Sequence, residues 1–577
     1  MEQVHILLHC ARLSINEFFD AYDSAETVGI TVFIVLSLIW LKNFLFQEES
    51  LAARINRVVF KVAKILPAVS LKIECEKKKA TNDFQTNMLR LHEGRPYVTH
   101  LPKTGWSRER ILEEVKSNLK LGHYKWKEGY VSGCVYNLND ELVKILTEVY
   151  GLASYTNPLH PDIFPGACKM EAEVVRMTLN LFHGSEEACG TMTSGGTESI
   201  LMACKSYRDY AVEEKGIKHP EIVIPVTAHP AFDKAASYFG LRIKHVPVDP
   251  DTTTVDLKAM RRYISRNTCM IAGSAPNFPY GTIDPIEDIA ALGRKYNIPV
   301  HVDSCLGGFI TAFMDKAGVS HPPYDFSIPG VTSISADTHK YGFAPKGSSV
   351  IMYSEKKFLH HQYCVFPDWP GGVYGSPTVN GSRAGGIIAA CWATLMYFGV
   401  EGYADATKKI LQTTKYIEEG LRKMEEIFIF GKPGTSVIAI GSNVFHIYLL
   451  SEGLTKKGWN LNPLQFPCGI HLCVTYMHTA DGVADKFLSD VREEIEIIMK
   501  NPKADVAGKT DHHTGLCEKQ AESSLDKQHE PSSLMAMYGM AQSIPDRSVV
   551  GDFTRYFLDA MYITKGANEE VYRNGFK

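Results

Sequence analysis

The stretch that decides the fold reads Ser-Ala-Asp-Thr-His-Lys-Tyr-Gly and spans residues 335–342. It follows the β-rich run Thr332–Ser335, which predicts a buried strand that ends at Ser335. Lys340 therefore lies just past the carboxyl end of a strand, where α/β proteins bind ligands. Its apolar neighbours predict a partly desolvated ammonium group. Desolvation lowers the pKa of a lysine and leaves a free amine that can form a Schiff base.

Asp303 ends a second apolar strand, in Ile298-Pro-Val-His-Val-Asp303. A carboxylate at this position pairs with a buried cation, binds a metal or caps a helix. Pyridoxal chemistry uses such a carboxylate to hold the pyridine nitrogen protonated. His229 likewise follows a strand and precedes a helix, where an imidazole can stack on a heteroaromatic ring or serve a structural role.

The segment Thr193-Ser-Gly-Gly-Thr-Glu-Ser199 precedes the helical run Ile200–Tyr210. Small residues at the start of a helix leave N–H groups free to bind an anion, so the segment predicts a phosphate cradle. It contains neither G-x-G-x-x-G nor Gly-Lys-Ser/Thr, which excludes the dinucleotide fingerprint and the Walker loop. Plain helix capping remains the alternative.

The order of these motifs predicts the fold class. Apolar β-rich runs alternate with helical stretches from about residue 140 to 400, which indicates a mainly parallel sheet covered by helices on both faces. The anion loop, His229, Asp303 and Lys340 each follow a strand, so we expect them at one edge of that sheet. The predicted strands are Ile222–Val226, Met270–Ala272, Pro299–Val302, Thr332–Ser335 and Ser349–Tyr353.

A second block, from about residue 405 to 500, predicts a small α+β lobe. Its closing helix, Gly482–Lys500, carries an apolar stripe at helical spacing. A further helix is predicted at Ser548–Tyr562. The strands predicted for the lobe are Ser436–Ile440, Val444–Leu449 and His471–Thr475.

The run Val28–Phe46 is apolar on every face and long enough to cross a bilayer, with a buried core helix as the alternative. Four acidic residues lie before it, within residues 17–26, and four basic residues follow within 54–64. The positive-inside rule places the N-terminus outside the cytosol and the rest of the chain inside it.

Composition excludes several classes. The 577 residues carry a formal net charge of −4, without the basic excess of a general nucleic-acid binder. The 13 cysteines form no CxxC pair, which argues against a zinc ribbon or a thioredoxin-type site. The polar stretch 503–533 reads as a solvated loop despite His512 and His513, and we predict no metal site.

Two further stretches, Asn157-Pro-Leu-His-Pro-Asp-Ile-Phe164 and Ala344-Pro-Lys-Gly347, complete a recognisable pattern. With them the chain resembles fold-type I pyridoxal-phosphate enzymes of the group II decarboxylase branch, and within it the sphingosine 1-phosphate lyase family. The resemblance runs from the membrane segment to about Gln542. It departs from the family around residues 508–533, where the polar stretch is longer than expected.

The resemblance implies a large, mainly parallel-sheet domain, a small C-terminal α+β domain and one N-terminal transmembrane helix in the endoplasmic reticulum membrane. It implies pyridoxal 5'-phosphate as cofactor, with Lys340 bonded to it, Asp303 on the ring nitrogen and His229 stacked on the ring. The implied ligands of the cofactor phosphate are Gly196, Thr197, Ser335 and His339.

The resemblance also implies a homodimer that cleaves phosphorylated long-chain bases by a retro-aldol reaction, with Tyr136 and His160 as proton-transfer groups. A group II amino-acid decarboxylase and an inactive membrane scaffold are the alternatives. The residues implied for the substrate phosphate are Lys346, Tyr136, Asn157, His160, Tyr374 and Arg383; for Asn157, Tyr374 and Arg383 a structural hydrogen bond is the alternative.

These expectations divide the chain into seven segments. They are a lumenal N-terminus (1–27), a transmembrane helix (28–46), a connector and N-terminal arm (47–140), a large cofactor-binding domain (141–400), a small C-terminal domain (401–502), a flexible loop (503–533) and a helical tail (534–577).

Overall fold

The computed structural model describes residues 22–45, 58–59, 62–92, 95, 97–122, 124–502 and 547–564. Two compact units are distinguished: residues 1–88 with 541–577, and residues 89–540. The predicted loop 503–533 and the first 21 residues lie outside the described part of the chain.

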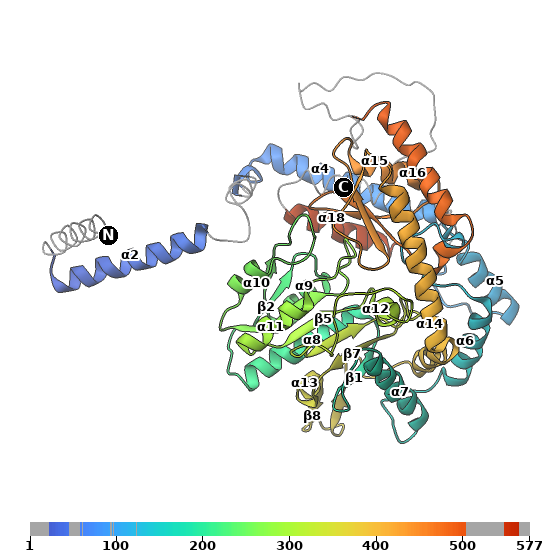
Figure 1. Cartoon of the computed structure of the whole chain (residues 1–577), viewed down its shortest axis with the longest axis horizontal. Coiled ribbons are helices and arrows are strands. Elements are labelled where there is room, and N and C mark those ends of the chain that lie inside the picture. The colour runs from blue at the N-terminus through green and yellow to red at the C-terminus, as the bar shows by residue number, and fades with distance from the viewer. Residues whose placement is uncertain are drawn as a thin grey trace. The chain divides into compact units, whose positions relative to one another are not determined.

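A seven-stranded sheet organises the larger unit (Figure 1). All neighbours pair in parallel except β7, which runs antiparallel to both β1 and β6. The predicted mainly parallel sheet is therefore confirmed. In spatial order the strands are β1 (Cys189–Thr193), β7 (Ser349–Tyr353), β6 (Ser333–Ala336), β5 (Val300–Asp303), β4 (Thr268–Ser274), β2 (Glu221–Pro225) and β3 (Arg242–Val246).

Both faces of the sheet are buried, as expected for parallel strands. On β2, Val223 belongs to one apolar cluster while Ile222 and Ile224 belong to another. The alternating side-chain direction of a strand explains this division. The covering helices include α7 (Pro165–Leu181), α8 (Gly196–Glu213), α9 (Ala231–Phe239), α11 (Ile286–Tyr296), α12 (Gly308–Met314) and α13 (Lys356–Gln362).

The small lobe contains a four-stranded antiparallel sheet in the order β10 (Phe428–Ile429), β11 (Val437–Gly441), β13 (Gly469–Cys473), β12 (Asn462–Leu464). The long helix α14 (Gly385–Leu421) precedes it, and Gly399, next to the predicted boundary at residue 400, leaves the helical conformation with φ 56°. The closing helix α16 (Val483–Met499) buries Phe487, Val491 and Ile495, which confirms the predicted stripe.

The strand predicted at Val444–Leu449 is wrong. The hydroxyl of Ser442 accepts hydrogen bonds from the N–H groups of Val444 and Phe445, which turns the chain. The side chain of His446 then accepts from the Tyr448 N–H and caps α15 (Ile447–Lys456). Local side-chain bonds to the backbone therefore override an apolar run that is typical of a strand.

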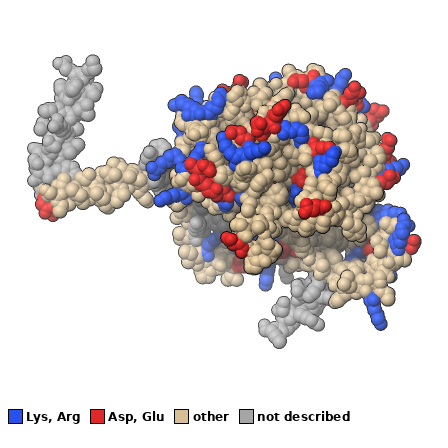
Figure 2. Space-filling model, turned by 90° about the horizontal axis from the view of Figure 1, so that it is seen from below, with Lys and Arg blue, Asp and Glu red and all other residues tan. Residues whose placement is uncertain are grey.

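The smaller unit contains α2 (Ser24–Leu45), α4 (Pro67–Leu91) and α18 (Arg547–Ala560). In α2 the window Ser24–Leu41 has a mean hydropathy of 1.9 with none of it buried, and Figure 2 shows one face of this helix as tan apart from acidic residues at one end. Helix α14 is also long and apolar, but 44% of its window is buried in the core. The predicted helix at Ser548–Tyr562 is confirmed as α18, which contacts α4 through Phe84 and Phe557, with ring centroids 5.6 Å apart.

Candidate active site

Four strands bring the predicted site residues to one edge of the sheet. Strands β1, β2, β5 and β6 point the same way, because β1 and β6 are both antiparallel to β7. The Gly-rich loop follows β1, His229 lies between β2 and α9, Asp303 ends β5, and Lys340 follows β6. The carboxyl ends of these strands therefore place all four motifs on the same side.

Lys340 forms an ion pair that the sequence did not predict. Its Nζ lies 2.7 Å from Oδ2 of Asp337, whose side chain is only 1% exposed. Oδ1 of Asp337 is buried and has no hydrogen-bond partner among the described residues. A buried carboxylate without a full set of donors is expensive, so Lys340 is its main compensation.

The expected fall in the pKa of Lys340 is wrong. Burial does lower the pKa, but Asp337, Cys305 and Asp303 raise it, and the net result lies above the usual value for lysine. The prediction considered desolvation alone, whereas a nearby opposite charge favours the charged form. In this structure Lys340 is therefore an ammonium ion.

His339 approaches the same oxygen of Asp337 as Lys340 does. Its Nδ1 accepts the Ser348 N–H at 3.1 Å, so the ring proton of the neutral imidazole is on Nε2. That nitrogen lies 3.6 Å from Oδ2 of Asp337. Burial lowers the pKa of His339, which keeps the ring neutral near pH 7.

The glycines of the anion loop permit close contact with these groups. A Cβ atom on Gly196 would lie 2.7 Å from Sγ of Cys305 and 2.9 Å from both carboxylate oxygens of Asp337. A Cβ atom on Gly195 would lie 3.2 Å from the His339 ring. Glu198, in the first turn of α8, accepts hydrogen bonds from the Ser194 N–H and hydroxyl at 2.7 and 2.6 Å. The loop is thus held open at a helix N-terminus, which suits a phosphate group.

Asp303 presents one oxygen to the protein. Its Oδ1 accepts the Cys305 N–H at 3.0 Å and the Ser335 hydroxyl at 3.5 Å. Within the described chain, no donor bonds Oδ2. The charges of Asp303 and Lys340 both affect His229, whose pKa is lowered mainly by burial, so these three side chains share one site. The free oxygen of Asp303 is suited to a protonated ring nitrogen.

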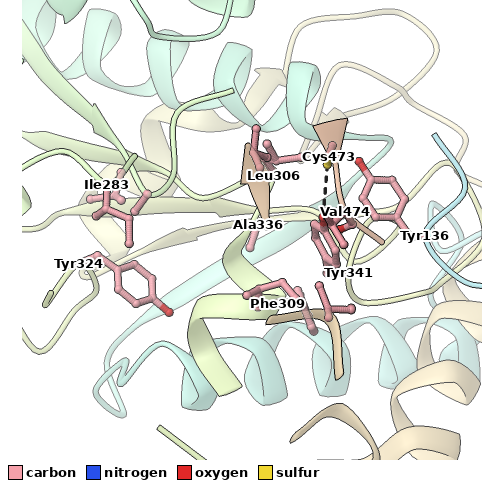
Figure 3. Close-up of a cluster of buried hydrophobic side chains, with 14 of the residues drawn as sticks. Tyr136, Ile283, Leu306, Phe309, Tyr324, Ala336, Tyr341, Cys473 and Val474 are labelled. Carbon is pink, nitrogen blue, oxygen red and sulfur yellow. Dashed lines mark hydrogen bonds between the residues drawn. The ribbon is translucent and has the colours of Figure 1, made fainter. Parts of the chain in front are cut away.

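Tyr136 and Lys346 lie beside this cluster. The Lys346 Nζ lies 4.7 Å from the centroid of the Tyr136 ring. Figure 3 shows Tyr136 next to Tyr341, whose hydroxyl donates to the Val474 carbonyl at 2.5 Å. Burial raises the pKa of Tyr136 and lowers that of Lys346. Tyr136 is therefore a neutral phenol that can donate a proton or a hydrogen bond.

Three of the predicted pocket residues make other contacts within the chain. The Arg383 guanidinium pairs with Glu171. The backbone N–H of Arg383 donates to Oδ1 of Asn157 at 3.1 Å. The ring of Tyr374 lies 6.2 Å from that of Trp369, in the hairpin of β8 (Cys364–Phe366) and β9 (Tyr374–Ser376). Within the described chain, the hydrogen bonds of His160 involve only its backbone. Among the described residues, no recorded contact joins these four to Lys340, so their substrate roles stay predictions.

Two features of the site were missed by sequence reasoning. Asp337 lies three residues before Lys340 and was read only as part of the motif, although a carboxylate so close to a candidate Schiff-base lysine is a usable signal. The Ser335 hydroxyl is fully buried and contacts His301, Cys305 and Asp303. Its predicted role at the cofactor phosphate stays a prediction.

Comparisons with known proteins identify the family. The family described as "Pyridoxal-dependent decarboxylase conserved domain" matches residues 93–441. The chain is 58% identical to sphingosine-1-phosphate lyase of Drosophila melanogaster, over 95% of this chain and 96% of that protein. The chain belongs to the sphingosine-1-phosphate lyase family. Sphingosine-1-phosphate lyase 1 of Mus musculus is 47% identical, over 98% of this chain and 95% of that protein.

A solved structure supports the same assignment. The sphingosine-1-phosphate lyase of Burkholderia pseudomallei superimposes with a TM-score of 0.68 and 43% identity, over 69% of this chain and 93% of that one. As a member of this family, the protein is a pyridoxal-phosphate-dependent enzyme with the fold-type I architecture. The residues present fit that cofactor, because the site combines a half-buried amine, a carboxylate with an oxygen that no described donor bonds, an imidazole and a glycine-lined anion loop.

The ion pair predicts the effect of Asp337→Asn on the cofactor-free protein. Without the carboxylate, burial becomes the dominant influence and the pKa of Lys340 should fall. We expect the pH of half-maximal labelling of Lys340 by an amine-selective reagent, followed by peptide mass spectrometry, to fall by at least about one unit. The exposed Asp315 supplies the control variant Asp315→Asn. An unchanged midpoint for Asp337→Asn would contradict the ion pair.

Proposed function

We propose that this enzyme cleaves phosphorylated long-chain bases, such as sphingosine 1-phosphate, into a long-chain aldehyde and phosphoethanolamine. The observation that carries the proposal is the convergence of Lys340, Asp303, His229 and the Gly195–Gly196 loop at one sheet edge. The high identity to curated lyases over nearly the whole chain supports the same substrate class.

In this proposal each residue has one task towards the cofactor. Lys340 binds it covalently, Asp303 holds the ring nitrogen through Oδ2, and His229 covers the ring. Gly196, Thr197 and His339 receive its phosphate. When bound, the cofactor supplies an aldehyde that takes up amines and a ring that accepts the electrons released by bond cleavage.

The chain's own residues then bind the substrate and move protons. The substrate amine would take the place of the Lys340 amine, and Asp337, 2.7 Å from Nζ, would stabilise the released Lys340 as an ammonium ion. Loss of the proton from the substrate's C3 hydroxyl would allow the C2–C3 bond to break and release the aldehyde, and return of a proton to C2 would give phosphoethanolamine. Tyr136 and His160 are the proposed proton-transfer groups, and Lys346 the proposed cation for the substrate phosphate.

An amino-acid decarboxylase is the alternative, and it needs a free cation for the substrate's α-carboxylate. Arg383 is a poor candidate within the chain because it already pairs with Glu171, with side chains only 14% and 12% exposed. The same pairing also counts against the predicted contact of Arg383 with the substrate phosphate. The high identity to curated lyases is therefore what favours the lyase reaction.

A product assay tests the proposed reaction. The full-length protein in detergent, supplied with cofactor and a phosphorylated long-chain base, should release aldehyde and phosphoethanolamine in equal amounts. Lys340→Arg should lower the rate by at least about a thousandfold, since the covalent amine is lost. Lys357→Arg, at a lysine that is 48% exposed, is the matched control. Carbon dioxide from amino acids, without aldehyde, would instead support the decarboxylase.

We also propose that the enzyme is a homodimer in which Tyr374 acts in the partner's site. The exposed apolar residues around it support this proposal, with Phe366 58% and Trp369 57% exposed on the same hairpin. The intramolecular contacts of Asn157 and Arg383 also leave the substrate end of the site incomplete in one chain.

Mixed dimers test this arrangement. One chain carries Lys340→Ala and the other Tyr374→Ala, with different affinity tags for purification of the mixed species. If Tyr374 acts across the interface, one of the two sites is intact and the mixed dimer should retain about half of the wild-type activity. Lys340→Ala mixed with Asp303→Asn should stay inactive, because both residues belong to the same site. Inactivity of both mixtures would contradict the proposal.

We propose that α2 anchors the enzyme in the endoplasmic reticulum membrane with the catalytic unit in the cytosol. The apolar, unburied window Ser24–Leu41 supports the anchor, and the flanking charges support this orientation. Tethering would raise the effective concentration of a substrate that partitions into bilayers.

Deletion of residues 1–60 tests the anchor. The shortened protein should leave the membrane fraction yet keep most of its activity on detergent-solubilised substrate, measured by aldehyde release. A shortened protein that stays in the membrane fraction after a salt wash would contradict the anchor. Loss of activity on solubilised substrate would contradict the proposal that catalysis does not require the anchor.

A further inference from the structure

A buried polar chain lies behind Asp303, on the side away from the proposed cofactor contact. His301 precedes Asp303 by two residues on β5, so both side chains lie on the same face of the strand. On β6, Ser333 is the register partner of His301, and Ser335 is that of Asp303. His301, Ser333 and Ser335 are each fully buried.

Hydrogen bonds connect these residues in a line. Nδ1 of His301 lies 2.8 Å from the Ser333 hydroxyl, and Nε2 lies 3.2 Å from the Ser335 hydroxyl. The Ser335 hydroxyl in turn donates to Oδ1 of Asp303 at 3.5 Å, and the Cys305 thiol donates to Ser335 at 3.1 Å. The line ends on the carboxylate whose Oδ2 is left for the ring nitrogen.

The direction of the protons follows from the carboxylate. The Ser335 hydroxyl donates its proton to the carboxylate oxygen Oδ1 of Asp303. Ser335 then accepts from His301, which places the imidazole proton on Nε2, and Nδ1 accepts from Ser333. Burial lowers the pKa of His301 to about 4, so the ring is neutral at physiological pH and has one donor and one acceptor, as this line requires.

We propose that His301 is a positioning residue that acts through Ser335 to fix Asp303, with Oδ1 held by the protein and Oδ2 presented to the cofactor ring. This inference rests on the proposed function, because it depends on the contact between Asp303 and the ring nitrogen. It assigns the Ser335 hydroxyl to Asp303 in place of the cofactor phosphate. Loss of the His301 or the Ser335 side chain should make the Asp303 carboxylate less well held without removing it.

Four variants of the full-length protein test this relay, which runs from His301 through Ser335 to Asp303. His301→Leu and Ser335→Ala should each weaken cofactor binding by about tenfold, the scale of a lost hydrogen bond to a charged group, and shift the visible absorbance of the bound cofactor. The double variant should be no worse than the more affected single variant. His301→Gln keeps one donor and one acceptor, so it should restore the spectrum and bring affinity to within about threefold of wild type.

A histidine with a purely structural role should affect stability and leave the bound cofactor unchanged. His478 is another buried histidine whose pKa is lowered to about 4, away from Asp303, and His478→Leu should lower the melting temperature but leave the cofactor spectrum unchanged. The relay is wrong if His301→Leu keeps wild-type affinity and spectrum, or if the effects of the two single variants simply add. If instead the wild-type protein binds no cofactor and forms no aldehyde, the proposed function itself has failed.

Discussion

The site depends on the common direction of four strands. Because β1, β2, β5 and β6 end at one edge, an anion loop, an imidazole, a carboxylate and an amine from positions as distant as 196 and 340 lie together. Burial of both sheet faces fixes that edge, since strands such as β2 and β7 pack alternate residues into two separate apolar clusters. The chemistry therefore rests on the sheet rather than on any single loop.

Charge balance is the second constraint. Two buried carboxylates, Asp303 and Asp337, lie around one half-buried lysine, Lys340, and the N-terminus of α8 lies beside them. The structure keeps Lys340 charged when it has no covalent partner, which prevents an unpaired carboxylate in the core. Bonding of this amine to a carbonyl must therefore be coupled to a change in the proton on Lys340 or Asp337. Sequence reasoning that considered burial alone gave the wrong direction for the lysine pKa.

The sequence predicted what depends on local pattern. Strand ends, the mainly parallel sheet, the apolar stripe of α16 and the helix α18 follow from periodicity and turn residues, and the structure has them close to the predicted bounds. The false strand at Val444–Leu449 arose because capping by Ser442 and His446 is invisible to an apolar pattern. Pairings between distant residues, such as Arg383 with Glu171 or His301 with Ser335, depend on register and packing that no single motif encodes.

The central claim is that Lys340 carries the cofactor, and its most direct measurement is borohydride reduction of the purified, cofactor-loaded protein followed by peptide mass spectrometry. The account predicts that the reduced pyridoxyl group is found on Lys340, in the peptide that also contains Asp337 and His339. A modification on another lysine such as Lys346, or no modified peptide at all, would contradict it.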